Sequence, residues 1–471
     1  MKKRLLPFVL FAMLCTSASV FGNVLLPSII GSHMVLQQKT DVTLWGWATA
    51  AEKIRVIVDW DTTVYTTTAN SGARWSLKIK TPAAGGPYKI IISGNNAIVL
   101  EDVMIGEVWV CSGQSNMEWS GDQGLKQTLD EAPNATNTKI RFFYVAKATS
   151  DYPQDDCRGH WVVCNPEDMK HFSAVGYFFG KKLQQELNAP VGLINSNWGG
   201  TPAEVWTPKE VLENDATLKA AAAKLNPAPW WPMQPAATYN AMIYPLTHYA
   251  IAGALWYQGE GNTGTAASYE LLLTNMIGAW RKAWNSDLAF YLVQIAPFTY
   301  GNNNIGALLR EAETKAAGYP NTGMVVITDL VSDVTNIHPV NKIDVALRLA
   351  NYALAQTYGK TGFTYKSPVY KEMKIEKDKV RIYFNNVDSG LISKGQPTEF
   401  YIAGDDKKFV PATAKIDGNT VVVFSKDVPQ PVAVRFGFSN TATPNLFSKE
   451  GLPVNLFRTD NWEVNTDPVK Q

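Results

Sequence analysis

The run Gly106–Met117 reads GEVWVCSGQSNM and joins a strand-like apolar segment, Glu107–Cys111, to a turn containing Gly113 and Ser115. A buried strand that ends in such a turn presents side chains at the carboxyl end of a parallel sheet, where open α/β sheets form their sites. A Gly-x-Ser turn is weak evidence by itself, because serine is common in turns. The rest of the chain must therefore show whether Ser115 is functional.

Strand-like and helix-like segments alternate from residue 105 to residue 362. Apolar residues at helical spacing over Ser173–Leu187 are followed by the strand-like Val191–Asn195, and the alternation continues to the helix-like Lys342–Tyr358. This pattern predicts an α/β domain over 105–362, with a parallel sheet covered by helices on both faces.

Two β-rich regions flank this domain, at residues 23–104 and 363–471. Short alternating runs such as Val42–Trp47 and Thr420–Phe424, separated by turn residues, predict sandwich-like accessory regions. Because both regions show this strand-like pattern, they could pack together as one accessory unit, which the sequence leaves open.

The N-terminus has the pattern of an export signal. Lys2, Lys3 and Arg4 precede the apolar run Leu5–Leu14, and small residues lead to a cleavage point before Asn23. We therefore expect residues 1–22 to be a signal peptide and the mature protein to be periplasmic or extracellular. No later segment is long and apolar enough to predict a membrane span. In an oxidising compartment, Cys157 and Cys164 can form a disulfide or remain two free thiols.

Composition excludes several classes of function. The chain has 471 residues and a formal net charge of +1, so there is no electrostatic case for nucleic acid as a partner. No paired Cys or His spacing predicts a metal site, and no cofactor is expected.

Three further polar loops follow strand-like segments. They hold Gly199 and Gly200, then Gln258 with Glu260, and finally His338. Glycine N–H groups and an amide can stabilise an oxyanion, and histidine is suited to proton transfer near neutral pH. Together with Ser115 they supply a nucleophile, oxyanion donors and a base, which are the parts of acyl transfer to water.

These loops resemble those of the sialate O-acetylesterase family within the SGNH-type hydrolases. The resemblance extends over nearly the whole mature chain. The matching stretches are Gly106–Trp119, Trp198–Pro202, Tyr239–Ile243, Trp256–Glu260, Ile337–Pro339, Gly451–Pro453 and Phe457–Asp460. The resemblance implies a three-layer SGNH-hydrolase-like fold and a serine carbohydrate O-acetylesterase without a metal. It also implies Ser115 as nucleophile, His338 as base, and an acyl-enzyme intermediate. The implied oxyanion hole combines the Ser115 N–H, a glycine N–H of Gly199–Gly200 and the Gln258 amide, where many SGNH enzymes use Asn.

The third member of a catalytic triad is less well defined. Many SGNH enzymes place Asp three residues before the histidine, but Thr335 occupies that position here. Asp333 is slightly favoured, while Asp329, Glu260 and a Ser–His dyad without an acid remain open.

The substrate side of the prediction rests on Asn116, Glu260, Trp198 and Trp231. Trp231 lies in the Pro- and Trp-rich insert Asn226–Pro232, which either walls the cleft and stacks on sugar rings or is a rigid surface loop. The expected substrate is an O-acetylated carbohydrate, either sialic acid or an acetylated plant glycan such as xylan or xyloglucan. The motif loops contain no Arg for a sialate carboxylate, which slightly favours a neutral glycan. The alternative is a carbohydrate-binding protein that kept the fold and lost the activity.

Overall fold

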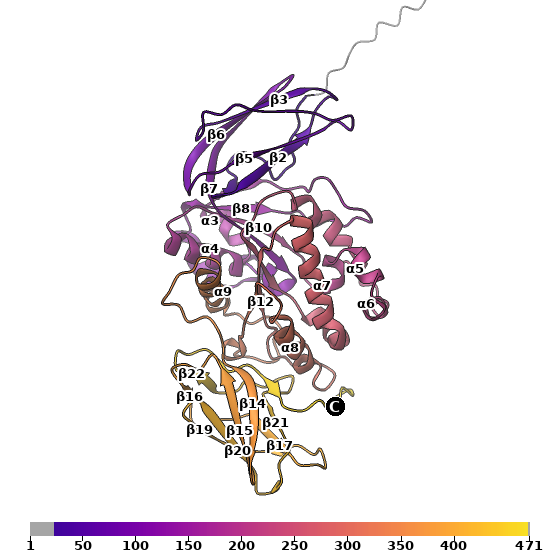
Figure 1. Cartoon of the computed structure of the whole chain (residues 1–471), viewed down its shortest axis with the longest axis vertical. Helices are drawn as coiled ribbons and strands as arrows, with labels where there is room; N and C mark the ends of the chain where they lie inside the picture. Colours follow the sequence, from indigo (N-terminus) through magenta and orange to yellow (C-terminus); the bar gives the residue numbers. More distant parts are fainter. Residues whose placement is uncertain (1–22, 470–471) are drawn as a thin grey trace, which may run out of the picture.

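The structure, a computed structural model, describes residues 23–469. The predicted signal peptide, residues 1–22, lies outside the described residues. The α/β domain occupies the middle of the molecule, and the two β-rich regions lie at its opposite ends (Figure 1). The flanking regions therefore do not form the single accessory unit left open by the sequence. Each extends from a different end of the central domain.

The central sheet is parallel except for one edge strand, in the order β13-β12-β11-β7-β10-β8-β9. Its strands are β7 (Ala97–Gly113), β8 (Asn137–Tyr144), β9 (Trp161–Cys164), β10 (Val191–Asn197), β11 (Gly253–Tyr257), β12 (Ala289–Val293) and β13 (Thr322–Val325). The chain builds β8 and β10 on one side of β7 and then β11 to β13 on the other. The carboxyl end of β7 is consequently a topological switch point, where ligands bind in such sheets.

Alternation along β7 explains why helices cover both faces of this sheet. Val108 and Val110 join a hydrophobic core with residues of α7, whereas Trp109 and Cys111 join a second core with residues of α4 and α9. The helices of the domain are α1 (Ser115–Glu118), α2 (Lys126–Glu131), α3 (Pro166–His171), α4 (Ala174–Leu187), α5 (Lys209–Glu213), α6 (Ala216–Ala222), α7 (Ala266–Trp284), α8 (Ile305–Ala316) and α9 (Lys342–Gln356). The prediction of a mainly parallel sheet within an α/β domain is confirmed.

The N-terminal β-rich region shares a strand with the central sheet. Its strands are β1 (Val35–Gln37), β2 (Asp41–Trp47), β3 (Lys53–Val58), β4 (Tyr65–Thr68), β5 (Arg74–Lys80) and β6 (Gly85–Ser93). The first half of β7 pairs antiparallel with β6, and its second half enters the central sheet. The boundary expected at residues 104/105 thus falls inside one continuous strand. The hydrophobic core of this region is also continuous with one core of the α/β domain.

The C-terminal β-rich region has a hydrophobic core of its own. It contains a sheet ordered β14-β15-β20-β19, a second ordered β18-β17-β21-β23, and the pair β16-β22. The strands are β14 (Val369–Glu376), β15 (Lys379–Asn385), β16 (Leu391–Ser393), β17 (Phe400–Ala403), β18 (Val410–Pro411), β19 (Thr413–Asp417), β20 (Thr420–Phe424), β21 (Ala433–Phe436), β22 (Leu446–Ser448) and β23 (Phe457–Arg458). The guanidinium of Arg458 pairs with Glu311 of α8 at 2.8 Å, which ties this region to the α/β domain.

Two smaller expectations concern cysteines and membrane spans. Cys157 and Cys164 are buried free thiols in the structure, so of the two alternatives the disulfide is not observed. Over residues 23–469, every helix is too short or too polar to cross a membrane.

Candidate active site

Ser115 is the first residue of α1 and follows the switch-point strand β7 after a tight turn. Gly113, the last residue of β7, has φ +131°, and a Cβ at this position would lie 2.3 Å from the carbonyl oxygen of Tyr257 on β11. Only glycine fits so close to the neighbouring strand in this left-handed conformation. Gly113 therefore brings Ser115 to the carboxyl edge of the sheet.

His338 lies directly beside Ser115. Its Nε2 is 2.9 Å from the Ser115 Oγ, although the two residues are 223 positions apart in the chain. The ring of Trp119 stacks on the imidazole, with centroids 4.4 Å apart and an angle of 19° between the planes. The His338 backbone N–H donates to the side chain of Asn336 at 2.9 Å. The imidazole is thus held where it can accept the serine proton.

The predicted triad acid does not reach this histidine. The exposed Asp333 carboxylate instead accepts hydrogen bonds from the N–H and the hydroxyl of Thr335, at 2.8 and 2.7 Å. Asp329 pairs with Arg348 at 2.6 Å. Among residues 23–469 no carboxylate forms an ion pair or hydrogen bond with the His338 ring. Asp333, slightly favoured as the triad acid, does not contact His338 in the structure, because a local turn bonds its carboxylate to Thr335. Of the alternatives left open, this geometry fits the Ser115–His338 pair without an acid.

A cluster of buried polar side chains connects the segments that carry Ser115 and His338. Asn116 donates to Glu260 at 2.6 Å and to the Ile337 carbonyl at 3.0 Å, and its side-chain oxygen accepts from the Lys342 ammonium at 2.6 Å. These bonds tie the residue after Ser115 to the residue before His338. Asn116 and Glu260, predicted as substrate contacts, are buried. Their geometry fits a positioning role.

Burial also sets the charges at the site. Burial, together with the nearby Lys342 charge, lowers the pKa of His338 to about 4. Burial lowers the pKa of the Lys342 ammonium to about 7, and it raises the pKa of Glu260. At neutral pH His338 is therefore an uncharged imidazole, the form that can take a proton from Ser115.

The predicted oxyanion donors are only partly available. Gly199 lies next to Ser115, since a Cβ on Gly199 would be 3.3 Å from the serine Cβ. That N–H donates to the Glu118 carboxylate at 2.6 Å, and the other oxygen of Glu118 binds Lys147 at 2.5 Å. Gly200, with φ +78°, lies against the ring of Trp231.

Gln258 has its amide engaged within the protein. Its NH₂ group donates to the Thr201 carbonyl at 3.2 Å and to the side chain of Asn262 at 2.9 Å. Its carbonyl oxygen accepts from the Tyr269 hydroxyl at 2.8 Å. With both amide hydrogens bonded, Gln258 is placed to hold the glycine loop in position. The structure does not leave it free to bind an oxyanion.

An aromatic cleft of about 660 Å³ lies beside the Gly199–Gly200 loop, since the lining residue Trp198 directly precedes Gly199 and the Trp231 ring lies against Gly200. Trp198, Trp230 and Trp231 line it together with the prolines of the Asn226–Pro232 insert, and Trp230 is 78% exposed. The structure thus brings Trp198 and Trp231 together beside the candidate site.

Sequence reasoning missed three residues of this site. Glu118 and Trp119 lie three and four positions after Ser115, inside the run that carried the resemblance, but nothing there indicated their contacts. Lys342 begins α9, and a lysine at a helix start usually faces solvent. Its complete burial could not be foreseen from residue type.

A serine hydroxyl beside a neutral imidazole, at the switch point of a parallel sheet, is an arrangement suited to acyl transfer. Comparison with known proteins shows that the chain is a carboxylic ester hydrolase. Residues 105–355 match the carbohydrate esterases described as sialic acid-specific acetylesterases. This match covers more than half of the chain, which therefore belongs to that family.

Individual relatives support the same assignment. The chain is 28% identical to sialate O-acetylesterase from Rattus norvegicus over 412 residues, covering 74% of this chain and 76% of that protein. It is also 28% identical to the Homo sapiens sialate O-acetylesterase, covering 74% of each chain. Among solved structures, the carbohydrate acetylesterase XAC1771 from Xanthomonas citri matches with a TM-score of 0.85 and 36% identity. That match covers 93% of this chain and 100% of the other.

Proposed function

We propose that this chain is an exported serine O-acetylesterase of the SGNH type, which releases acetate from O-acetylated glycans. The observation that carries the proposal is the 2.9 Å contact between the Ser115 hydroxyl and the His338 ring, whose pKa is lowered to about 4. An uncharged histidine in that position can activate a serine that is otherwise a poor nucleophile.

In the first half of the reaction, the Ser115 Oγ attacks the acetyl carbonyl carbon while His338 Nε2 takes the hydroxyl proton. The tetrahedral intermediate collapses as the bond from carbonyl carbon to sugar oxygen breaks, and the imidazolium returns the proton to that oxygen. Acetyl-Ser115 remains. His338 then takes a proton from water, whose oxygen attacks the acetyl carbon. The bond from that carbon to the Ser115 Oγ breaks, the imidazolium returns the proton to the Oγ, and the acetyl group leaves as acetic acid, which ionises to acetate.

The proposed oxyanion donors are the backbone N–H groups of Ser115 and Gly199. In the free protein the Glu118 carboxylate holds the Gly199 N–H, so the substrate must displace it. Lys147, which already binds the other oxygen of Glu118, retains that charge after displacement. Gln258 acts indirectly, by holding the Thr201 carbonyl next to the glycines.

The cleft indicates an uncharged glycan as the substrate. Indole rings stack on the apolar faces of sugars, and three of them line the aromatic cleft, where the Trp231 ring lies against Gly200. Lys147, the cation over the Trp198 ring at 5.7 Å, is already paired with Glu118 and so is not free for a sialate carboxylate. Acetylated xylan or xyloglucan fits this charge pattern better than acetylated sialic acid does.

The direct test is acetate release from acetylated xyloglucan, acetylated xylan and 9-O-acetylated sialosides, measured for the wild type and Ser115→Ala. We expect release from a neutral polymer by the wild type alone. Release from sialosides alone would overturn the substrate assignment. No release by either protein would favour the binding protein that has lost activity.

We expect Trp231→Ala to raise the KM for acetylated polymer about tenfold, because losing one stacking contact costs roughly a factor of ten in affinity. The kcat for 4-nitrophenyl acetate should stay within about twofold, since this small ester does not need a sugar platform. Trp462→Ala, in the C-terminal region, is the matched control. Equal loss on both substrates would show that Trp231 supports the loop rather than the sugar.

The pH profile tests the electrostatics of the base. With a pKa of about 4, His338 stays uncharged down to acidic pH, so kcat/KM should remain high through pH 6 and fall only near pH 4. Lys342→Met removes a positive charge that disfavours the imidazolium, so the His338 pKa and the acid limb should move upward. Lys360→Met, at an exposed site beyond α9, should leave the limb in place. If the wild-type kcat/KM already fell at pH 6.5 or above, the lowered pKa of His338 as the catalytic base would be contradicted.

A further inference from the structure

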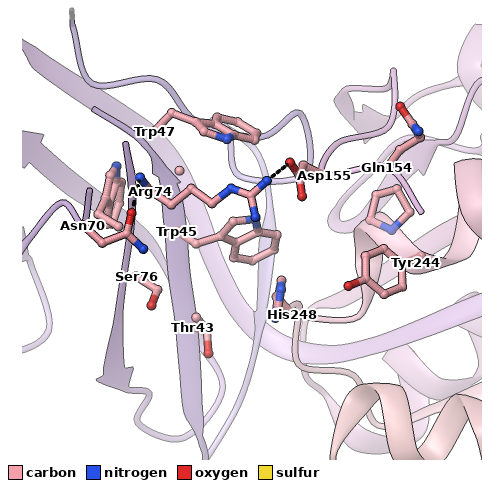
Figure 2. Close-up of a pocket in the computed structure, with 13 residues that line it drawn as sticks. Thr43, Trp45, Trp47, Asn70, Arg74, Ser76, Gln154, Asp155, Tyr244 and His248 are labelled. Carbon is pink, nitrogen blue, oxygen red and sulfur yellow. Dashed lines mark hydrogen bonds and ion pairs between the residues drawn. The ribbon is translucent and has the colours of Figure 1, made fainter. Parts of the chain in front are cut away.

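A second cavity, here called the interdomain pocket, lies between the N-terminal β-rich region and the α/β domain (Figure 2). Its volume is about 320 Å³, at the lower end of the roughly 300–1,000 Å³ typical of small-molecule sites. One wall comes from β2, β5 and the turn before β5. The other comes from Gln154, Asp155, Tyr244 and His248 of the α/β domain.

The interdomain pocket lies at the opposite end of the sheet from Ser115. Tyr244 and His248 precede β11, whereas the site loop containing Gln258 follows it. The N-terminal region likewise joins the first half of β7, and Ser115 follows the last residue of that strand. A ligand in this pocket would therefore leave the catalytic pair and its aromatic cleft free.

Aromatic rings form the β2 side of the pocket. Trp45 and Trp47 are two positions apart on β2 and so point to the same face. Trp45 also contacts the His248 ring edge-on, with centroids 5.5 Å apart, across the boundary between the regions. Trp47 is only half-buried, so part of its indole remains accessible.

Polar groups converge between these rings. Arg74, the cross-strand partner of Trp47, extends between the two indoles toward Asp155, with which it forms an ion pair (Figure 2). The pair uses Nη2 of Arg74 and one oxygen of Asp155. Arg74 has further N–H donors and Asp155 a second oxygen, and these groups can hydrogen-bond to the hydroxyls of a sugar.

The charge of the pocket selects among possible ligands. Of the described residues that line it, Arg74 is the one arginine and Asp155 the one carboxylate, and they neutralise each other. An anionic sugar would have to break this pair to find a cation. An uncharged sugar can keep it, offering hydroxyls to both ions and an apolar ring face to an indole.

We propose that the interdomain pocket binds an uncharged sugar residue and tethers a glycan chain at the end of the enzyme remote from Ser115. The choice of glycan rests on the proposed function, but binding here requires no ester chemistry. The pocket therefore contributes affinity for polymer and leaves hydrolysis of small esters unaffected.

The test is binding of unacetylated xyloglucan and xylan to the full chain by native affinity electrophoresis, with Kd for xyloglucan oligosaccharides and for sialyllactose from calorimetry. We expect the wild type to bind a neutral glycan, and Trp47→Ala to weaken that binding at least tenfold. Trp47→Phe should recover most of it. Trp231→Ala, in the aromatic cleft, should leave the Trp47-dependent part of the binding intact.

Esterase activity separates this proposal from the previous one. Trp47→Ala should hydrolyse 4-nitrophenyl acetate at the wild-type rate. A wild type inactive on every ester would overturn the proposed function, but it would not contradict glycan binding in the interdomain pocket. If Trp47→Ala does not fold, the exposed Arg74→Met tests the same site, again with an expected loss of at least tenfold. The proposal is overturned if the wild type binds neither polymer, if the pocket variants bind like the wild type, or if sialyllactose is the ligand they lose.

Discussion

We expect Ser115→Ala to lower kcat for 4-nitrophenyl acetate by about 10⁴-fold or more. Removing the hydroxyl leaves His338 with only water to activate, and loss of a serine nucleophile costs factors of this size in related chemistry. The measurement is initial-rate hydrolysis, with acetate release from acetylated polymer as a second readout. The thermal midpoint should change little, because the hydroxyl makes its hydrogen bond to a partly exposed histidine.

A matched control lies three residues upstream. Ser112 is buried in β7, and its hydroxyl has no hydrogen-bond partner among the described residues. Ser112→Ala should therefore retain activity within about twofold. If Ser115→Ala kept a tenth of the wild-type rate, another group would have to be the nucleophile.

His338→Ala should produce the second large effect, a loss of about 10³-fold or more in kcat, since His338 is the base hydrogen-bonded to the Ser115 hydroxyl. Asp333→Asn should change kcat by no more than about twofold. Its carboxylate is exposed and bonded to Thr335, so it neither orients nor stabilises the His338 ring.

The comparison of these two variants decides between a dyad and a triad. A loss of a hundredfold or more in Asp333→Asn would mean that this loop rearranges to bring the acid to His338 during turnover. Asp329→Asn serves as a third variant. It breaks the ion pair with Arg348, so its effect should appear in thermal stability before it appears in kcat.

Much of the architecture was predictable because the spacing of apolar residues along the sequence reflects which side of a helix or strand is buried. The helix-like segment Ser173–Leu187 is observed as α4, Ala174–Leu187, and the strand-like run Thr420–Phe424 has the same bounds as β20. The meeting of Ser115 and His338 was predictable for a related reason. Both follow parallel strands, and parallel strands end at one edge of a sheet.

The sequence by itself thus determined the α/β domain, the order of the site loops and the pairing of Ser115 with His338. Only the tertiary structure decided which polar groups are bonded to one another. In the structure Asp333 is hydrogen-bonded to Thr335, Gln258 to Thr201 and Glu118 to Gly199. Lys342 lies in a buried polar cluster. The two β-rich regions lie at opposite ends of the α/β domain. Residue type and spacing show that a side chain can donate or accept a hydrogen bond. Its partner depends on distances of a few tenths of an ångström, which are fixed only when distant segments pack.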